Sequence, residues 1–221
     1  MDFNEFSHRY DGLELLPVSR SDYAPGYIFD KVGLAHRHFE PTGDFLIELL
    51  PYATEADRTA ARTQLRGLPR LPTELAGQDL DLTSQFKGGA DLKLANIPQS
   101  LTAAIQQHSV ESFRFENTTS TTMPPELLPR LRALLDQLRD QDGSQYRRRI
   151  AGNFIAMTFF YAGSASIVLD TQSDISGSLE ADIKKVDANA NLSYTSNGKL
   201  SISFKQPDCP FAMDVKKGRQ F

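Results

Sequence analysis

Between Ser164 and Lys205 apolar and polar residues alternate, which is the period of a β-strand and not of a helix. Up to residue 183 the apolar positions are odd, and they hold Ala165, Ile167, Leu169, Ile175, Leu179, Ala181 and Ile183. After Lys184-Lys185 the apolar positions are even, and they hold Ala188, Ala190, Leu192, Tyr194, Leu200, Ile202 and Phe204. Because successive side chains lie on opposite sides of a strand, the stretch predicts long strands with one apolar and one polar face. Such strands occur in a soluble sheet that rests on a core and in the wall of a membrane β-barrel.

The dipeptide Asn197-Gly198 is a turn signal inside this stretch. A two-residue turn would pair Tyr194 with Ser201 and mix the two faces. A three-residue loop that begins at Ser196 instead pairs Tyr194 with Leu200, which keeps the apolar face continuous. We therefore predict the three-residue loop, with its glycine in a bulge.

A second alternating segment lies earlier in the chain, around Gly88-Gly89. Its apolar positions hold Leu80, Leu82, Phe86, Ala90, Leu92 and Leu94, and its polar positions hold Asp79, Asp81, Gln85, Lys87, Asp91 and Lys93. The paired glycines at the centre predict either a hairpin or one long bent strand.

Two helices have clear sequence signals. Thr54 and Asp57 form the pattern of a capping box, which predicts a helix from there to about Arg66, before Gly67. A second helix is predicted over Pro125–Gln141 from one stripe of leucines: Leu127, Leu128, Leu131, Leu134, Leu135 and Leu138. We expect this stripe to pack on the sheet, although it could also bind a partner.

Short apolar runs between turn signals predict the remaining strands: Leu13–Val18, Gly26–Val32, Asp44–Leu50, Val110–Glu116 and the buried run Ile150–Ala162. The predicted fold is α+β, with a twisted, mostly antiparallel sheet, long amphipathic hairpins and packed helices. A chain of this length can bury a sizeable core, as one large domain or two small ones, and we expect residues 1–221 to form a single domain.

Composition limits the partners. The net charge of −4 gives no general attraction to nucleic acid, so no nucleic-acid partner is expected. Local basic runs exist at Arg147–Arg149, Lys184-Lys185 and Lys216–Arg219. Such runs are usually solvated surface, and the functional alternative is contact with phosphate head groups. The single cysteine, Cys209, and the absence of a visible signal sequence favour a cytoplasmic location. No apolar window approaches the ~18 residues of a membrane-spanning helix.

No group of residues forms a recognisable catalytic pattern, so we expect no enzyme activity, no cofactor and no metal site. His36 and His38 have no third ligand at a spacing typical of zinc. The sequence Gly163–Ser166 lacks the second glycine of a nucleophile elbow, and no phosphate-binding glycine loop is present. Cys209 lies between Asp208 and Pro210, without a neighbouring base to activate it.

Four stretches carry a family resemblance: YDGLELLPVSRSDYAPGYIFDK (Tyr10 to Lys31), ELAGQDLDLTSQFKGGADLKL (Glu74 to Leu94), SVESFRFENTTSTTMPPELLPRLRALL (Ser109 to Leu135) and Ser164 to Phe211, which ends in CPFAMDVKKGRQF. In pattern and order they resemble the opening strand, the first amphipathic extension, the strand leading into a helix, and the second extension with the closing strand of the gasdermin pore-forming domain. The small bacterial gasdermins are the most similar in this respect.

The resemblance implies a soluble monomer that forms homo-oligomers in membrane lipid and kills the host cell, in bacteria as a defence against phage. Its membrane-inserting hairpins would be Asp79–Asn96 and Ser164–Lys205. The residues expected to insert are Leu80, Leu82, Phe86, Leu92, Leu94, Ile167, Leu169, Leu179, Ile183, Leu192, Tyr194, Leu200, Ile202 and Phe204. The residues expected to contact lipid head groups are Arg147, Arg148, Arg149, Lys184 and Lys185. On activation the protein would move to the inner face of the cell membrane.

The resemblance also implies autoinhibition. Bacterial gasdermins commonly carry a lipidated cysteine near the start and a cleaved inhibitory tail, whereas this chain begins Met1-Asp2-Phe3-Asn4 and ends at Phe221. We therefore expect either a separate inhibitor or activating protease as a partner, or a relative that does not form pores alone.

A different class of function stays open beside the pore. A soluble α+β interaction module that binds a partner protein along an exposed strand edge would show the same alternation. Polar faces rich in Ser, Thr, Asn, Asp and Gln and small apolar residues such as Ala181 and Ala188 favour the pore. Leakage of dye from liposomes separates the two hypotheses.

Overall fold

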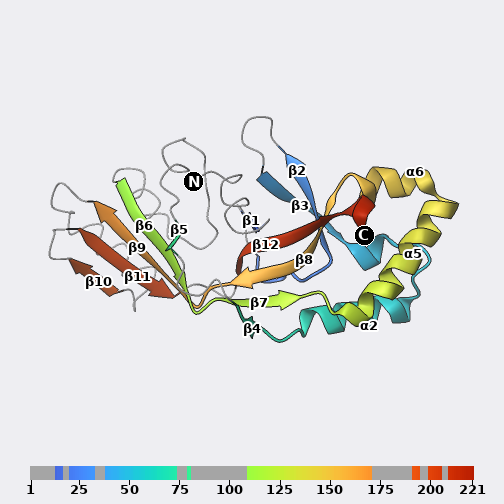
Figure 1. Cartoon of the computed structure of the whole chain (residues 1–221). Helices are drawn as coiled ribbons and strands as arrows, with labels where there is room; N and C mark the ends of the chain where they lie inside the picture. Colours follow the sequence, from blue (N-terminus) through green and yellow to red (C-terminus); the bar gives the residue numbers. More distant parts are fainter. Residues whose placement is uncertain are drawn as a thin grey trace.

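The described part of the chain forms two antiparallel sheets that share one long ribbon of strands (Figure 1). The computed structural model describes residues 13–16, 20–32, 38–73, 79–80, 109–170, 191–194, 199–205 and 209–221. Every strand pair among these residues is antiparallel, and helices lie at the end of the first sheet that is farther from the second. The predicted α+β fold with antiparallel sheets is therefore confirmed.

The first sheet carries the strands that pack against the helices. Its order is β1 (Glu14–Leu15), β12 (Pro210–Lys217), β8 (Phe154–Tyr161), β2 (Tyr27–Val32) and β3 (His38–Phe45). The strand β7 (Thr119–Thr122) pairs with the later part of β8 and with β4 (Leu71–Pro72). The sequence of β8, FIAMTFFY, is apolar at almost every position, which is typical of a strand covered on both faces.

The second sheet continues the ribbon beyond a bend. Its order is β10 (Asn191–Tyr194), β11 (Leu200–Lys205), β9 (Ser164–Asp170), β6 (Ser109–Glu116) and β5 (Asp79–Leu80). Along the chain β6 leads into β7, and β8 leads into β9. β7 pairs with β8 before the bend and β6 pairs with β9 beyond it, so the same two segments of the chain stay paired on both sides.

Both predicted helices are confirmed. The helix α2 (Glu55–Arg66) begins with the expected capping box, in which the Asp57 amide donates to Thr54 Oγ1 at 3.1 Å and the Thr54 amide donates to Asp57 Oδ2 at 2.9 Å. The helix α5 (Leu128–Gln141) follows the single turn η2 (Pro125–Leu127). Its buried residues are those of the leucine stripe: Leu131, Leu134, Leu135 and Leu138.

The main core lies between these helices and the first sheet. The four buried leucines of α5 belong to the same cluster as Phe29 and Phe159 of the sheet. Tyr23 stacks on Phe159 with ring centroids 5.7 Å apart and meets Phe29 edge to face at 5.5 Å. The leucine stripe therefore packs on the sheet, as expected.

Two strand predictions need correction. Asp44–Leu50 is not a strand, because β3 ends at Phe45 and η1 (Leu46–Leu49) is a 3-10 turn. Leu46, Ile47 and Leu49 are all buried, and a helical turn can direct adjacent apolar residues to one core where an alternating strand cannot.

The start of the buried run is also wrong, since Ile150 lies in the π-helical turn η3 (Arg147–Ala151) and β8 begins only at Phe154. Asn153 closes that turn, with its amide donating to Ile150 O at 3.0 Å and its side chain to Arg149 O at 2.9 Å. The remaining short elements are α6 (Gly143–Tyr146) and η4 (Gly218–Gln220).

Candidate functional site

The second sheet has a continuous apolar face. Leu200 pairs with Leu169, and Ile202 pairs with Ile167, in adjacent strands. Directly opposed residues of an antiparallel pair lie on the same face of the sheet, so these four side chains form one surface. Each of them is at most 2 % exposed. They nevertheless lie outside the cluster that forms the main core, so the second sheet buries its own set of apolar side chains.

The face extends onto β6. Phe115 pairs with Ala165, and both side chains are buried. One step along, Phe113 pairs with Ile167, and on its other side with Leu80 of β5. The pairing therefore joins a residue of each predicted inserting segment to the same strand.

In the other direction the face becomes exposed. Leu192 of β10 pairs with Ile202, and Tyr194 pairs with Leu200, which is the register predicted from a three-residue loop. The loop itself lies outside the described residues. Leu192 is half-buried, and Tyr194 is 61 % exposed. The apolar surface is thus buried at its centre and open to solvent at the β10 edge.

The opposite face is polar. It is formed by alternate residues of the same strands: Arg114, Glu116, Ser164, Ser166, Asp170, Asn191, Ser193, Ser201, Ser203 and Lys205. Val168 is the apolar interruption on the described part of β9. The Ser164 hydroxyl donates to Glu116 Oε2 at 3.3 Å across this face, and Lys199 forms an ion pair with Glu111. Hydroxyls and charges on one face and hydrocarbons on the other make the sheet amphipathic.

The bend between the two sheets is built by specific residues that the sequence did not reveal. Asn117 has a φ of +53°, a left-handed conformation that Asn tolerates better than most residues. The Gly163 amide donates to Glu116 O at 3.1 Å, and a Cβ at Gly163 would lie 3.1 Å from Asn117 Cβ. Phe115 and Phe211 stack at the junction with ring centroids 4.1 Å apart. These contacts lie where the ribbon passes from the first sheet to the second.

Several predicted inserting residues cannot be placed. Those outside the described residues are Leu82, Phe86, Leu92, Leu94, Leu179 and Ile183, together with the head-group candidates Lys184 and Lys185. For Leu80 and Phe204 the structure gives only the pairing, Leu80 with Phe113 and Phe204 with Ala165.

The head-group candidates Arg147, Arg148 and Arg149 do not lie near the apolar face. They are exposed residues of η3, which follows α6 at the end of the molecule away from β10 and β11 (Figure 1). η3 packs against η4, where the Gly218 amide donates to Asn153 O at 2.9 Å. The packing brings the arginine run and the basic run Lys216–Arg219 to the same end of the first sheet.

Metal ligands do not gather in the described part of the chain, where no three His, Cys, Asp or Glu side chains are placed to hold an ion. None of its helices combines the length and the apolar character needed to cross a membrane. Within these residues the amphipathic second sheet is the feature that points most directly to a function.

Comparison with known proteins finds similarity in structure and not in sequence families. No protein-family model and no curated protein matches this sequence. A solved structure of a bacterial gasdermin from Bradyrhizobium tropiciagri is similar to the chain, with 10 % sequence identity and a TM-score of 0.47. The similarity covers 97 % of this chain and 85 % of that one. Membership of the gasdermin family stays a prediction.

Proposed function

We propose that this protein permeabilises membranes as a gasdermin-like pore former. In this proposal it is not an enzyme. It oligomerises with copies of itself, inserts the Asp79–Asn96 and Ser164–Lys205 segments as amphipathic hairpins, and causes cell death, in bacteria as anti-phage defence. The observation that carries the proposal is the register of β9, β11 and β10. It places the alternating apolar residues of three strands on one face and their polar residues on the other.

The dimensions of the strands suit this role. β9 is described over seven residues, which extend to about 24 Å, and the apolar band of a membrane β-barrel is about 25 Å tall. A tilted strand needs ~9–11 residues to span it. The alternation in the sequence continues past Asp170 to Ile183, so the segment contains enough alternating residues for a strand of this length.

Insertion requires the buried part of the apolar face to be uncovered. Ile167, Leu169 and Ile202 are almost fully buried in the described fold, so exposing them to water costs roughly 1.5–3 kcal/mol for each side chain. Lipid removes this cost once the sheet has entered a membrane. The proposal therefore includes a release step, in which a separate inhibitor dissociates or an activating protease cuts. It also includes a cytoplasmic location for this protein and its movement to the inner face of the cell membrane.

The basic end of the molecule supplies the proposed membrane contact. Arg147, Arg148 and Arg149 are exposed at the same end of the first sheet as Lys216 and Arg219, and polybasic surfaces gain about 1 kcal/mol for each Lys or Arg near anionic lipid. Replacing the three arginines by glutamine should release the protein from vesicles that contain phosphatidylserine. Unchanged sedimentation with such vesicles would contradict this contact.

A matched pair of substitutions on β10 tests the pore. Leu192 lies on the apolar face and is half-buried, whereas its neighbour Ser193 is exposed on the polar face. A lysine on the lipid face costs roughly 2–4 kcal/mol at the bilayer midplane. Leu192→Lys should therefore abolish the leakage of dye from liposomes, while Ser193→Lys should keep it.

Thermal melts of both variants control for folding. If the wild-type chain never permeabilises liposomes, with or without a co-expressed partner or added protease, the pore proposal is wrong. Equal leakage from the two variants would keep the pore and reject this assignment of its lipid-facing side.

A second candidate function has its own observation. β10 pairs with β11 on one side only among the described residues, and Tyr194 is 61 % exposed on this edge. An exposed strand edge with an aromatic side chain can bind an extended segment of a partner protein. Co-purification of a partner that is lost with Tyr194→Ala, in a protein that never leaks dye, would favour this interaction module.

A further inference from the structure

The connection from α2 into β4 is an exposed apolar segment with two prolines. Its sequence is Leu68-Pro69-Arg70-Leu71-Pro72, and all of these residues except the half-buried Leu68 are exposed. Among the described residues, Leu71 and Tyr194 are the large apolar side chains that are exposed, and Leu71 is 60 % exposed. A partner that covered Leu71 would gain the free energy of removing its hydrocarbon from water. We call residues 68–72 the proline segment.

The prolines restrict the backbone of this segment. A proline ring fixes its own φ near −65° and pushes the residue before it toward an extended or polyproline II conformation. Every residue of the segment except Arg70 is restricted in one of these two ways. A polyproline II helix repeats about every three residues, so Pro69 and Pro72 would lie along one edge of it. The spacing Pro-x-x-Pro is the pattern that domains for polyproline II segments recognise.

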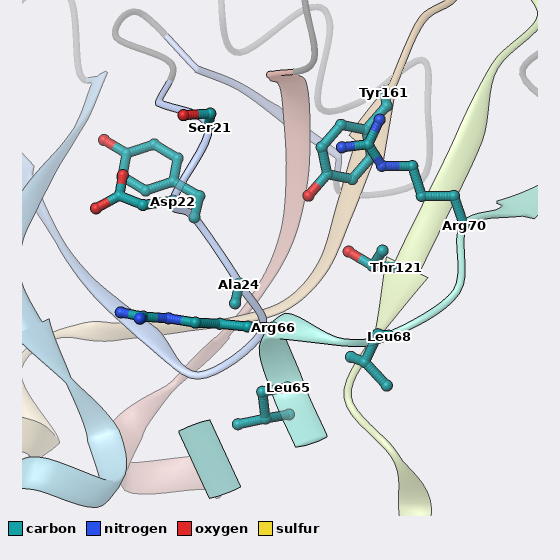
Figure 2. Close-up of a pocket in the computed structure, with 10 residues that line it drawn as sticks. Ser21, Asp22, Ala24, Leu65, Arg66, Leu68, Arg70, Thr121 and Tyr161 are labelled. Carbon is teal, nitrogen blue, oxygen red and sulfur yellow. The ribbon is translucent and has the colours of Figure 1, made fainter. Parts of the chain in front are cut away.

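One side of the proline segment is fixed to the fold. Leu68 and Arg70 line a cavity of about 200 Å³ beside α2, whereas Pro69 and Leu71 are not part of its lining (Figure 2). Leu68 packs against the main core. Figure 2 shows Arg70 reaching across to the ring of Tyr161, where its guanidinium carbon lies 3.8 Å from the ring centroid. Alternate residues of an extended chain lie on opposite sides, so Pro69 and Leu71 are left facing outward.

Pairing with β7 holds the end of the segment extended. The two residues of β4 pair with Ser120 and Thr119, and just beyond them the Thr73 amide donates to Thr118 O at 3.2 Å. Among the described residues β4 pairs with β7 alone. A strand added to its other edge would find no amide hydrogen at Pro72. A partner at this edge therefore has to recognise side chains and not the backbone.

The segment and its flanks are positively charged. Residues 66–73 include Arg66 and Arg70 and no Asp or Glu, although the whole chain has a net charge of −4. Partner surfaces are arranged so that their charges are complementary. A groove that receives this segment should therefore have carboxylates at its rim.

We propose that the proline segment binds a protein domain whose groove is lined by aromatic side chains and rimmed by carboxylates, of the kind that recognises polyproline II segments. Pro69, Leu71 and Pro72 enter the groove, while Arg70 stays on the ring of Tyr161. Because the fold already holds the segment extended, little conformational entropy is lost when it binds. The proposal does not depend on pore formation, and its surface is separate from the β10 edge.

Titration of the full chain with a purified, fluorescently labelled SH3 domain, and separately with a WW domain, tests this surface. Both classes bind Pro-x-x-Pro segments in aromatic-lined grooves, and we expect one of the two to bind. Pro72→Ala should weaken the binding by about tenfold, and Leu71→Asp by more, because its carboxylate would face the acidic rim. Both side chains are exposed, so the melting temperatures of the variants should stay close to that of the wild type.

Pro51→Ala is the matched control. Pro51 is also exposed, in the turn before α2, but it has no proline three residues away, so this variant should bind like the wild type. A free peptide of residues 66–73 forms a second arm. It should bind the same domain more weakly than the full chain does, because the peptide has to become ordered on binding. Raising the salt concentration should weaken both complexes.

Three results would overturn the proposal: neither domain binds the full chain, Leu71→Asp and Pro72→Ala bind as tightly as the wild type, or only the free peptide binds. The last result would show that β7 and Tyr161 block the segment. Loss of binding with Tyr194→Ala, but not with Leu71→Asp, would assign the contact to the β10 edge. A chain that binds one of the domains but never releases dye from liposomes would keep this contact and reject the pore, so the two failures are distinguishable.

Discussion

β8 and β9 follow each other in one ribbon, but β8 is buried on both of its faces and β9 on only one. β8 is buried at most positions, and Ile155, Ala156 and Phe159 are fully buried. β9 alternates strictly between buried and half-buried residues. Both strands have antiparallel neighbours on either side, so strand pairing is not the difference. The difference is that other elements cover both faces of the sheet at β8 and only one face at β9. A sheet with one uncovered face can bind a membrane or a partner.

Truncation of the main core, between the helices and the first sheet, should have the largest effect. Phe159→Ala removes a fully buried ring that contacts Tyr23 and Phe29, and should lower the free energy of unfolding by about 3–5 kcal/mol. Urea denaturation followed by circular dichroism measures this loss. Ile202→Ala on the second sheet is the companion variant, with an expected loss of about 2–5 kcal/mol if that sheet unfolds together with the first.

Hydrogen exchange decides whether the two sheets unfold together. Under the proposed function the amides of β9 and β11 exchange through an opening of lower free energy than those of β8 and β12. Ile202→Ala should then speed exchange in the second sheet and leave the first unchanged. Equal protection of both sheets would remove the contrast between them.

The bend between the sheets comes next in size. Asn117→Ala places an ordinary side chain at a φ of +53° and should cost about 1–2 kcal/mol, whereas Asn117→Gly should be nearly neutral. The two midpoints of urea unfolding measure the difference. Similar midpoints for Ala and Gly would show that the bend does not depend on this backbone conformation.

Local signals in the sequence determined how much of this comparison could be predicted. The alternation of Ser164–Asp170 and of the residues after Leu200 predicted both faces, and the register of β10 against β11 followed because a slip of one residue would reverse every side chain. The capping box at Thr54 and the leucine stripe of α5 were equally local. The amphipathic face was therefore predictable as a pattern.

Features that depend on contacts far apart in sequence were not predictable. β3 contains Pro41 and Gly43, which usually mark a turn, but the strand pairs with β2 on both sides of an irregularity at which Gly43 has a φ of +83°. The loop Ser21–Ala24, the end of α2, Thr121 and Tyr161 line one cavity although they are far apart in the sequence. Nothing near Thr121 in the sequence shows that its hydroxyl would be buried with no hydrogen-bond partner among the described residues.

A helix cap on the first-sheet side should have a smaller effect than the bend. Thr54→Ala removes the side chain that accepts from the Asp57 amide, and should lower the free energy of unfolding by about 1 kcal/mol. Thr54→Ser keeps the hydroxyl and is the control, with nearly wild-type stability expected. Because α2 packs into the core of the first sheet, exchange in β9 should not respond to either variant.

The smallest effect is a pH dependence confined to the helices of the first sheet. The hydrogen bond from Arg130 on α5, followed by the bonds from Thr54, lowers the pKa of Asp57 to about 2. A carboxyl with a lowered folded-state pKa stabilises the fold above its unfolded pKa of about 3.9, and this contribution is lost as the pH falls through about 2. Arg130→Gln should move the pKa of Asp57 upward in a carboxyl-detected NMR titration, while Arg139→Gln, on the same helix but paired with Asp136, should leave it unchanged. Asp57 is solvated, so the resulting change in stability is small, and an equal titration midpoint in wild type and Arg130→Gln would show that the link between α2 and α5 does not form in solution.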